Sequence, residues 1–363
     1  MRVKIRNNYD DKHSMTVHLP KTPLELYDML DRLGVDNKYC NVYINIYDER
    51  IPEEMCEGGF YDDLFKLNFL AQRLEQMSPA DTAGFTAVLT AHEDYNLDDL
   101  ILVTYGLDAY PIYPCRDYTE LGEVVIDNNM IPEVENCPDE LVKYLDKAEI
   151  GRLAAEQFKG TFVDGYYCEV SDYEQPDMEI NISKPKRNEF QILIGETEKT
   201  AQWCPMPYNG EYTEEQVYEL RSPLPYIDHV ENISKLNELA EKIAALDNAD
   251  LVKLKAVMEL GEIDDVSGTI DAIDSLSEFD FDPNLRNESE FGREYLLRIL
   301  PQDFKTEIFD SLNTRDFGKR VLDAKEGLAT SYGIISGQGQ ELYAPLFREQ
   351  EQTEDEEMEV SLT

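Results

Sequence analysis

Carboxylates supply nearly all the residues of this sequence whose types and spacing could do chemistry. Asp94, Asn96 and Asp98 have the spacing of the first ligands of a calcium-binding loop. Such a loop also needs a glycine at its sixth position and a bidentate glutamate at its twelfth. Asp99 and Tyr105 occupy those two positions, so the sequence predicts no calcium site.

Other catalytic motifs are missing from the sequence. Glu133 and Glu135 could form an acid–base pair, but a pair carries almost no information among 76 acidic residues. We find no phosphate-binding glycine loop, no dinucleotide-binding motif and no serine-nucleophile motif, and GQGQ at 337–340 is typical of a flexible segment. The six cysteines lack a C-x-x-C pair and there are only four histidines, which indicates neither a zinc site nor a disulfide framework. We therefore expect no enzyme, no catalytic residue, no cofactor and no metal.

Charge is the outlying property of the composition. The 363 residues include 76 Asp plus Glu and 33 Lys plus Arg, which gives a net charge of −43. Such a chain would repel nucleic-acid phosphates, so we expect no direct binding of DNA or RNA and a basic partner instead. The alternative is that the charge serves only solubility or adaptation to high salt. No stretch of about 18 apolar residues occurs and the N-terminus has no apolar signal region, so the sequence predicts a cytoplasmic protein without a membrane segment.

The first residues predict a small α+β unit. Strands are expected at 3–8, 14–19 and 40–49, where apolar and polar residues alternate. A helix is expected between the last two strands, with Thr22 as N-cap, Pro23 in its first turn and Gly34 at its end. These elements define a unit at 1–58 with little net charge.

An internal duplication is the strongest pattern in the rest of the chain. KLNFLAQRLEQM at 66–77 resembles KLNELAEKIAAL at 235–246, an offset of 169 residues. After a one-residue insertion Gly122 matches Gly292, and after a net deletion of three residues Gly151 and Gly160 match Gly318 and Gly327. The periodic leucines of the first helix, such as Leu67, Leu70, Leu74 and Met77, are expected to form a buried stripe. We infer two copies of one module.

These patterns predict an elongated, multidomain α+β protein. The expected parts are an N-terminal α+β unit at 1–58, module 1 at 59–170, a β-hairpin and linker region at 171–230, module 2 at 231–340 and a disordered acidic tail at 341–363. The hairpin is expected to pair MEINIS with FQILIG across the basic loop KPKRN.

Acidic residues concentrate in the modules, which carry −14 over 71–170 and −11 over 231–340. Many stand three or four residues apart on expected helices, where like charges destabilise the helix by a few tenths of a kcal/mol per pair. Carboxylates on adjacent helical turns lie about 5 to 6 Å apart, comparable with phosphates along a DNA strand. The candidate partner-binding residues are Asp94, Asp98, Asp99, Glu120, Glu123, Asp127, Glu133, Glu135, Asp139, Glu140, Asp264, Asp265, Asp271, Asp274, Glu278, Asp280, Asp282, Glu288 and Glu290.

Each module resembles the ArdA antirestriction proteins of plasmids and conjugative transposons. The resemblance covers 66–168 well, through the LN-x-LA helix, the segment LDAYPIYPCRDYTELGE and the closing YLDKAEIGRLAAEQFKGTFVDGYY. It covers 235–335 less well, because Asn313 and Lys319 replace the Asp and Arg found in the first copy. The resemblance places interface or mimic residues at YTELGE (118–123) and at its counterpart NESEFGRE.

The resemblance implies an antirestriction protein whose acidic surface imitates DNA and occupies the DNA channel of type I restriction-modification enzymes. Relatives of this kind are dimeric, so a homodimer is one expectation, although two modules in one chain could replace a dimer. The alternative function is an acidic DNA mimic or adaptor that binds another basic DNA-binding protein, such as a nucleoid protein or a different defence complex.

Overall fold

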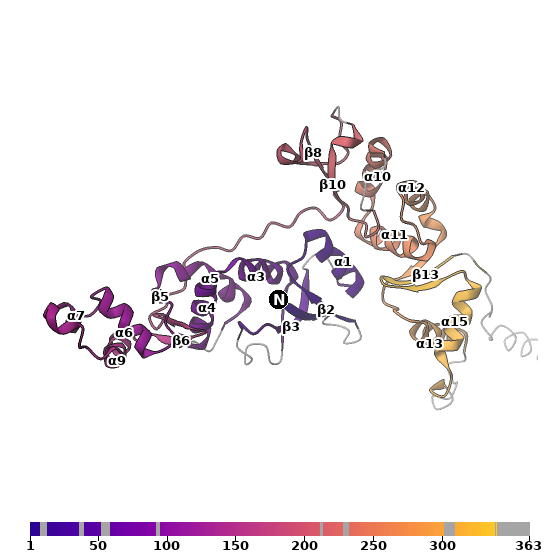
Figure 1. The fold of residues 1–363 in the computed structure, drawn as a ribbon. Coiled ribbons are helices and arrows are strands. Elements are labelled where there is room, and N and C mark those ends of the chain that lie inside the picture. Colours follow the sequence, from indigo (N-terminus) through magenta and orange to yellow (C-terminus); the bar gives the residue numbers. More distant parts are fainter. Residues whose placement is uncertain are drawn as a thin grey trace, which may run out of the picture. The chain divides into compact units, whose positions relative to one another are not determined.

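The protein is an α+β chain whose contacts divide it into two units. The computed structural model describes residues 1–7, 13–35, 40–51, 59–91, 95–210, 213–227, 232–300, 309–337 and 339. Unit 1 comprises Met1–Leu26 and Val35–Lys184, and unit 2 comprises Tyr27–Gly34 and Pro185–Thr363 (Figure 1). The expected acidic tail at 341–363 lies outside the described residues.

Unit 1 combines a four-stranded antiparallel sheet, a group of helices and a small three-stranded sheet. Its elements are, in chain order, β1 (Arg2–Arg6), β2 (Ser14–His18), the start of α1 (Pro23–Leu33), β3 (Asn41–Tyr47), β4 (Phe60–Asp63), α3 (Leu64–Gln76), α4 (Pro79–Ala91), α5 (Leu97–Gly106), η1 (Leu107–Ala109), β5 (Ile112–Tyr113), α6 (Tyr118–Asp127), α7 (Pro132–Glu135), α8 (Asp139–Val142), α9 (Lys147–Phe158), β6 (Thr161–Val163) and β7 (Tyr166–Cys168).

The expected N-terminal strands and helix are present. The Glu25 N–H donates to Thr22 Oγ1 (3.3 Å) and the Thr22 N–H donates to Glu25 Oε2 (2.8 Å), so the two residues form a capping box at the start of α1. Gly34 ends the helix with a left-handed φ of +64°. The expected boundary at 58 is too early for the sheet, because β4 pairs with β3 as far as Asp63.

Unit 2 has the same kinds of parts. Its elements, after the end of α1, are β8 (Gln191–Ile194), η2 (Glu198–Thr200), β9 (Gln202–Pro205), η3 (Glu214–Gln216), β10 (Val217–Arg221), α10 (Ile233–Ala245), α11 (Asn248–Gly261), α12 (Val266–Asp274), η4 (Leu276–Glu278), β11 (Asp280–Asp282), α13 (Glu288–Ile299), α15 (Thr314–Ala324), β12 (Leu328–Thr330) and β13 (Gly333–Ser336). The expected hairpin between MEINIS and FQILIG is wrong: residues 178–183 form no strand, and β8 pairs with β9 and β10.

The order of elements in unit 1 recurs in unit 2. Helices α3, α4 and α5 begin 169 residues before α10, α11 and α12. The sheets β5-β7-β6 and β11-β13-β12 have the same strand order: in each, the strand that comes third in the sequence lies between the other two. This shared order is the structural counterpart of the repeated sequence, and we keep the two-module description as our interpretation.

A pair of equivalent asparagines extends the likeness upstream of the repeated sequence. The Lys21 N–H donates to Asn68 Oδ1 (2.7 Å), and Asn68 Nδ2 donates to the Lys21 carbonyl (3.0 Å). In unit 2 the Tyr208 N–H donates to Asn237 Oδ1 (2.7 Å), and Asn237 Nδ2 donates to the Tyr208 carbonyl (2.8 Å). Each asparagine thus ties its helix, α3 or α10, to the residue that follows a proline after a strand.

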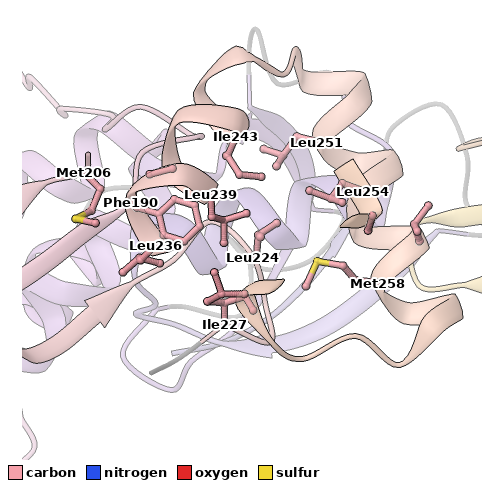
Figure 2. Packing of buried hydrophobic residues seen from close by; sticks show 14 of the residues in the cluster. Phe190, Met206, Leu224, Ile227, Leu236, Leu239, Ile243, Leu251, Leu254 and Met258 are labelled. Carbon is pink, nitrogen blue, oxygen red and sulfur yellow. The ribbon is translucent and has the colours of Figure 1, made fainter. Parts of the chain in front are cut away.

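The cores lie where the helical stripes meet the sheets. Leu67, Leu70 and Leu74 of α3 are buried as expected, and Met77 is half-buried at the end of the helix. In unit 2 the equivalent stripe of α10 packs with α11 and with residues of the β8 sheet, and Figure 2 shows these side chains gathered into one apolar cluster. The members labelled there are Phe190, Met206, Leu224, Ile227, Leu236, Leu239, Ile243, Leu251, Leu254 and Met258.

Paired glycines bring two helices of each module into backbone contact. A Cβ atom at Gly122 of α6 or at Gly151 of α9 would lie 1.8 Å from a backbone carbonyl oxygen of the facing helix. In unit 2 the corresponding distances at Gly292 of α13 and Gly318 of α15 are 2.1 and 1.8 Å. No side chain fits at such a distance, which explains in physical terms why glycine stands at all four positions.

A buried group of charged residues lies within unit 2. Lys255 of α11 is 1% exposed, and its Nζ donates to Asp28 Oδ1 (2.9 Å) and Asp31 Oδ2 (2.8 Å). Arg187 forms an ion pair with Asp31, and Arg32 Nε donates to Asp28 Oδ2 (2.7 Å). Burial lowers the pKa of Lys255 to about 8 against the opposing effect of Asp28. The group holds three cations and two carboxylates, so each carboxylate is needed to neutralise it.

We expect Gly122→Ala to destabilise unit 1, because the new methyl group would force α6 and α9 apart. The free energy of unfolding should fall by about 3 kcal/mol, as for overpacked cores. Thermal unfolding followed by circular dichroism, with amide hydrogen exchange of residues 118–127, measures this. The control is Gly337→Ala, where the nearest atom to a new Cβ lies 3.6 Å away. Equal melting temperatures for the two variants would contradict the close crossing.

We expect Asp31→Asn to destabilise unit 2 by about 3 to 5 kcal/mol at pH 7, because it leaves the buried Arg187 without its carboxylate partner and Lys255 with Asp28 alone. The exposed Asp323→Asn, on α15, is the control. Lys255 titrates near pH 8 in the folded chain and near its usual 10.5 when unfolded, so the unfolded chain holds more protons between these values and stability rises with pH there. The Asp31→Asn substitution lowers the pKa of Lys255 in the folded chain further. The decrease in the free energy of unfolding, measured with denaturant, should therefore be smaller at pH 9 than at pH 6.

Candidate partner-binding surface

The acidic candidates lie at the surface of the modules. Asp94 is outside the described residues, and all the other candidates are exposed or half-exposed, as acidic residues without a buried partner should be. The exposed ones are Glu123, Asp127, Glu133, Glu135, Asp139, Glu140, Asp264, Asp265, Asp271, Asp274, Glu278 and Asp280. The half-exposed ones are Asp98, Asp99, Glu120, Asp282, Glu288 and Glu290.

Some of these carboxylates stabilise the start of a helix. Asp99 forms a capping box with Asn96 at the start of α5 and accepts a hydrogen bond from Gln175 Nε2 (2.7 Å). Asp265 is the N-cap of α12 and accepts from the Gly268 N–H (2.8 Å). Capping of this kind needs no partner molecule to explain it.

Glu120 and Glu290 occupy matching places in the two modules. The Arg116 N–H donates to Glu120 Oε2 (2.8 Å) before α6, and the Arg286 N–H donates to Glu290 Oε2 (3.0 Å) before α13. Both acids also lie in the first helical turn, where the helix dipole favours a negative charge. Their placement therefore has a structural explanation.

Other candidates are paired with side chains of the same module. Asp98 lies 2.8 Å from Lys66 Nζ, and Glu123 lies 2.7 Å from Lys147 Nζ. Asp274 pairs with Lys242. The remaining paired acids are Glu133 with Gln157, Asp282 with Asn284 and Glu288 with Arg315. Exposed ion pairs with Lys or Arg stabilise a fold little, but they reduce the charge that each acid presents to a partner, whereas the hydrogen bonds to Gln157 and Asn284 leave the charge unchanged.

For eight candidates the described residues provide no side-chain hydrogen bond or ion pair, and all eight are exposed. We call them the unpaired acids: Asp127, Glu135, Asp139 and Glu140 in module 1, and Asp264, Asp271, Glu278 and Asp280 in module 2. Their charges are presented to solvent in full.

Two of the unpaired acids occupy places that oppose helix stability. Asp127 is the last residue of α6 and Asp271 lies in the last turn of α12, and neither helix has a basic residue in its last turn. The C-terminus of a helix carries partial negative charge, so an acid there costs about 0.3 to 1 kcal/mol. Capping and helix electrostatics therefore do not account for these two carboxylates.

The segment YTELGE at 118–123 serves the helix crossing as well as the surface. Gly122 makes the contact with α9, and Tyr118 packs edge-on against Phe162 with ring centroids 5.1 Å apart. Tyr118 nevertheless remains 41% exposed. Within this segment Tyr118 is the exposed large apolar side chain, and Glu123 is exposed beside it on the same helix.

No metal-binding group is formed by the part of the chain that the structure describes: no cluster of three or more His, Cys, Asp or Glu side chains is placed to hold an ion. Cys115 and Cys168 are buried free thiols, and burial raises the pKa of Cys168 to about 11. No helix among the described residues is long and apolar enough to cross a membrane.

No protein-family model matches the chain, and no curated protein matches it in sequence.

The sequence analysis missed one charged surface. Arg2, Lys4 and Arg6 alternate with the buried Val3 and Ile5 along β1, so the three cations share one face of the first sheet. The alternation in RVKIR was a sufficient signal, but the small net charge of the N-terminal region concealed it.

Substitution of two adjacent acids in module 2, Asp264 and Asp265, can distinguish a structural role from a partner-binding role. We expect Asp265→Ala to lower the free energy of unfolding by about 1 kcal/mol, because α12 loses its N-cap. Asp264→Ala removes the same charge from the neighbouring residue, which has no intramolecular contact, and should leave stability unchanged within about 0.5 kcal/mol. Chemical denaturation of both variants at one salt concentration measures the difference. Equal losses would mean that the cap contributes nothing or that Asp264 has a structural role.

Proposed function

We propose that this protein is a non-enzymatic DNA mimic that acts in the cytoplasm and occupies the DNA-binding channel of a type I restriction-modification enzyme. The observation that supports the proposal is the set of exposed carboxylates that form no side-chain hydrogen bond or ion pair with the described residues. Asp127 and Asp271 give the strongest support, because they lie in the last turns of α6 and α12, where a negative charge destabilises the helix. An acid that costs stability and forms no internal contact is explained by a partner that it meets.

The partner must be basic. A surface that presents unpaired carboxylates in a chain of net charge −43 attracts a positively charged channel and speeds its encounter with it. A channel that binds DNA neutralises phosphates with Lys and Arg, and carboxylates at similar spacing can replace those phosphates. The choice of a type I enzyme rests on the resemblance of both modules to ArdA proteins. Another basic DNA-binding protein is the alternative target.

Placed charge and total charge can be separated with matched variants. The module 1 variant replaces Asp127, Glu135, Asp139 and Glu140 by Asn or Gln, and the module 2 variant treats Asp264, Asp271, Glu278 and Asp280 in the same way. The control variant replaces by Gln four exposed acids of the β8 sheet region, which also form no side-chain hydrogen bond or ion pair with described residues: Glu196, Glu198, Glu215 and Glu219. Each variant loses four negative charges and keeps side-chain size nearly unchanged.

We expect each module variant to inhibit a type I enzyme at least about tenfold less well, since four charge contacts of a few tenths of a kcal/mol each sum to that loss. The control should lose less than about threefold, because only long-range steering changes. The inhibition constant is measured in a DNA cleavage assay at low and at physiological salt, with melting curves to confirm folding. Equal losses in all three variants would mean that only bulk acidity matters and would overturn the mimicry proposal.

A further inference from the structure

The first sheet of unit 1 presents a face unlike the rest of the surface. The pairing of β2, β1 and β3 aligns His18, Arg2 and Tyr47 in one row. Thr16, Lys4 and Asn45 form the next row, and Ser14, Arg6 and Tyr43 the third, with Tyr61 of β4 beside Tyr43. Side chains of such aligned residues share one face of a sheet, so three cations and three tyrosines lie together and no acid stands in these rows.

This face is accessible. Val3, Ile5, Val42, Ile44 and Ile46 are buried on the opposite side of the sheet against the core. On the outer side, by contrast, Tyr47 is 52% exposed and Tyr61 is 45% exposed. We call this outer side the basic sheet face and define it by Arg2, Lys4, Arg6, Tyr43, Tyr47 and Tyr61.

Guanidinium groups and rings are interleaved on the basic sheet face. Arg6 lies over the Tyr43 ring with 4.1 Å between the guanidinium carbon and the ring centroid, and Arg2 lies over Tyr47 at 5.5 Å. Such stacking holds the cations in the plane of the face. Alternate residues of a strand lie about 7 Å apart, so Arg2, Lys4 and Arg6 form a row of three positive charges at regular intervals.

The equivalent sheet of unit 2 lacks this composition. At its outer positions β8 has Gln191 and Leu193, and β10 has Glu219 beside Arg221. Only one cation, Arg221, stacks there on a ring, with 3.7 Å to the centroid of Trp203. The packing of a sheet in this fold therefore does not require three cations on its outer face.

We propose that the basic sheet face binds single-stranded nucleic acid. Regularly spaced cations suit the phosphates, and exposed tyrosines and guanidinium planes suit unpaired bases, which stack on them whatever their sequence. An acidic peptide would use the cations but not the rings, so the rings favour a strand with bases. The acids of the modules do not prevent this, because charges farther away than about 8 Å are largely screened at physiological ionic strength.

Duplex DNA is a different case. Reading a duplex groove needs a helix or a two-stranded ribbon that enters it, and a four-stranded sheet with flat rows of tyrosines does not enter a groove. The binding proposed for the basic sheet face is independent of the proposed inhibition of a restriction enzyme, which uses the modules. The two proposals can fail separately, because they concern different residues and different assays.

The test is the fluorescence anisotropy of a short labelled oligothymidylate titrated with the full-length chain at physiological ionic strength and at higher salt concentrations, where the charges of the modules are screened. We expect a dissociation constant in the micromolar range and a log–log salt slope near −2, as for about three neutralised phosphates of a single strand. The charge variant Arg2→Gln, Lys4→Gln, Arg6→Gln should bind at least about tenfold more weakly and lose the salt slope. A ring variant, Tyr47→Ala with Tyr61→Ala, should also lose about tenfold while keeping the slope.

The control variant changes three exposed cations of unit 2, Lys186→Gln, Lys199→Gln and Arg221→Gln, and so changes net charge equally. It should bind oligothymidylate within about twofold of the unaltered chain. Absence of binding by the unaltered chain at physiological ionic strength, or an equal loss in the control, would overturn the proposal. Full displacement of the oligonucleotide by a polyglutamate of equal charge, together with an inert ring variant, would assign the face to acidic peptides instead and would also overturn it.

Discussion

Repulsion among carboxylates is the constraint on which the rest of this structure depends. A chain of net charge −43 destabilises its own compact state, and burial of apolar side chains must offset that repulsion. Each module does so with the same means: a stripe of leucines on its first helix, a second apolar helix, and a helix pair that meets at glycines. The acids are left outside these cores, and none of the described candidates is buried.

The placement of the cations makes the surface of the modules still more acidic. Lys255 and Arg187 are buried in unit 2, and Lys66, Lys147 and Lys242 are held in ion pairs within their modules. Cations used in this way do not neutralise the unpaired acids. The modules therefore present a more negative surface to a partner than they would if acids and cations were spread evenly over the chain.

The elements that depend on local pattern were predictable from the sequence. Thr22, Pro23 and Gly34 delimit α1 because capping and left-handed backbone act within a few residues. The leucine stripe of α3 follows from helical period alone. What the sequence did not show depends on long-range contacts: the pairing of β8 with β9 rather than with MEINIS, the ion cluster around Lys255, and the internal partners of Asp98, Asp99 and Glu123. A pattern of acids in sequence cannot distinguish a cap, an ion pair and an unpaired charge, and only the unpaired ones support binding.

The unpaired acids and the basic sheet face show why net charge describes this protein poorly. Screening over about 8 Å makes each patch act through its own charges, so one chain can present carboxylates to a basic channel and cations to a single strand. The two units make the contrast sharper, because β1 and β8 each pair antiparallel with two neighbouring strands and each unit has the same asparagine contact, but the outer residues of the two strands differ. Since this pairing is common to both strands, it does not require the cations of β1. A difference between the two units that the shared pairing does not require is best explained by a surface contact that only unit 1 makes.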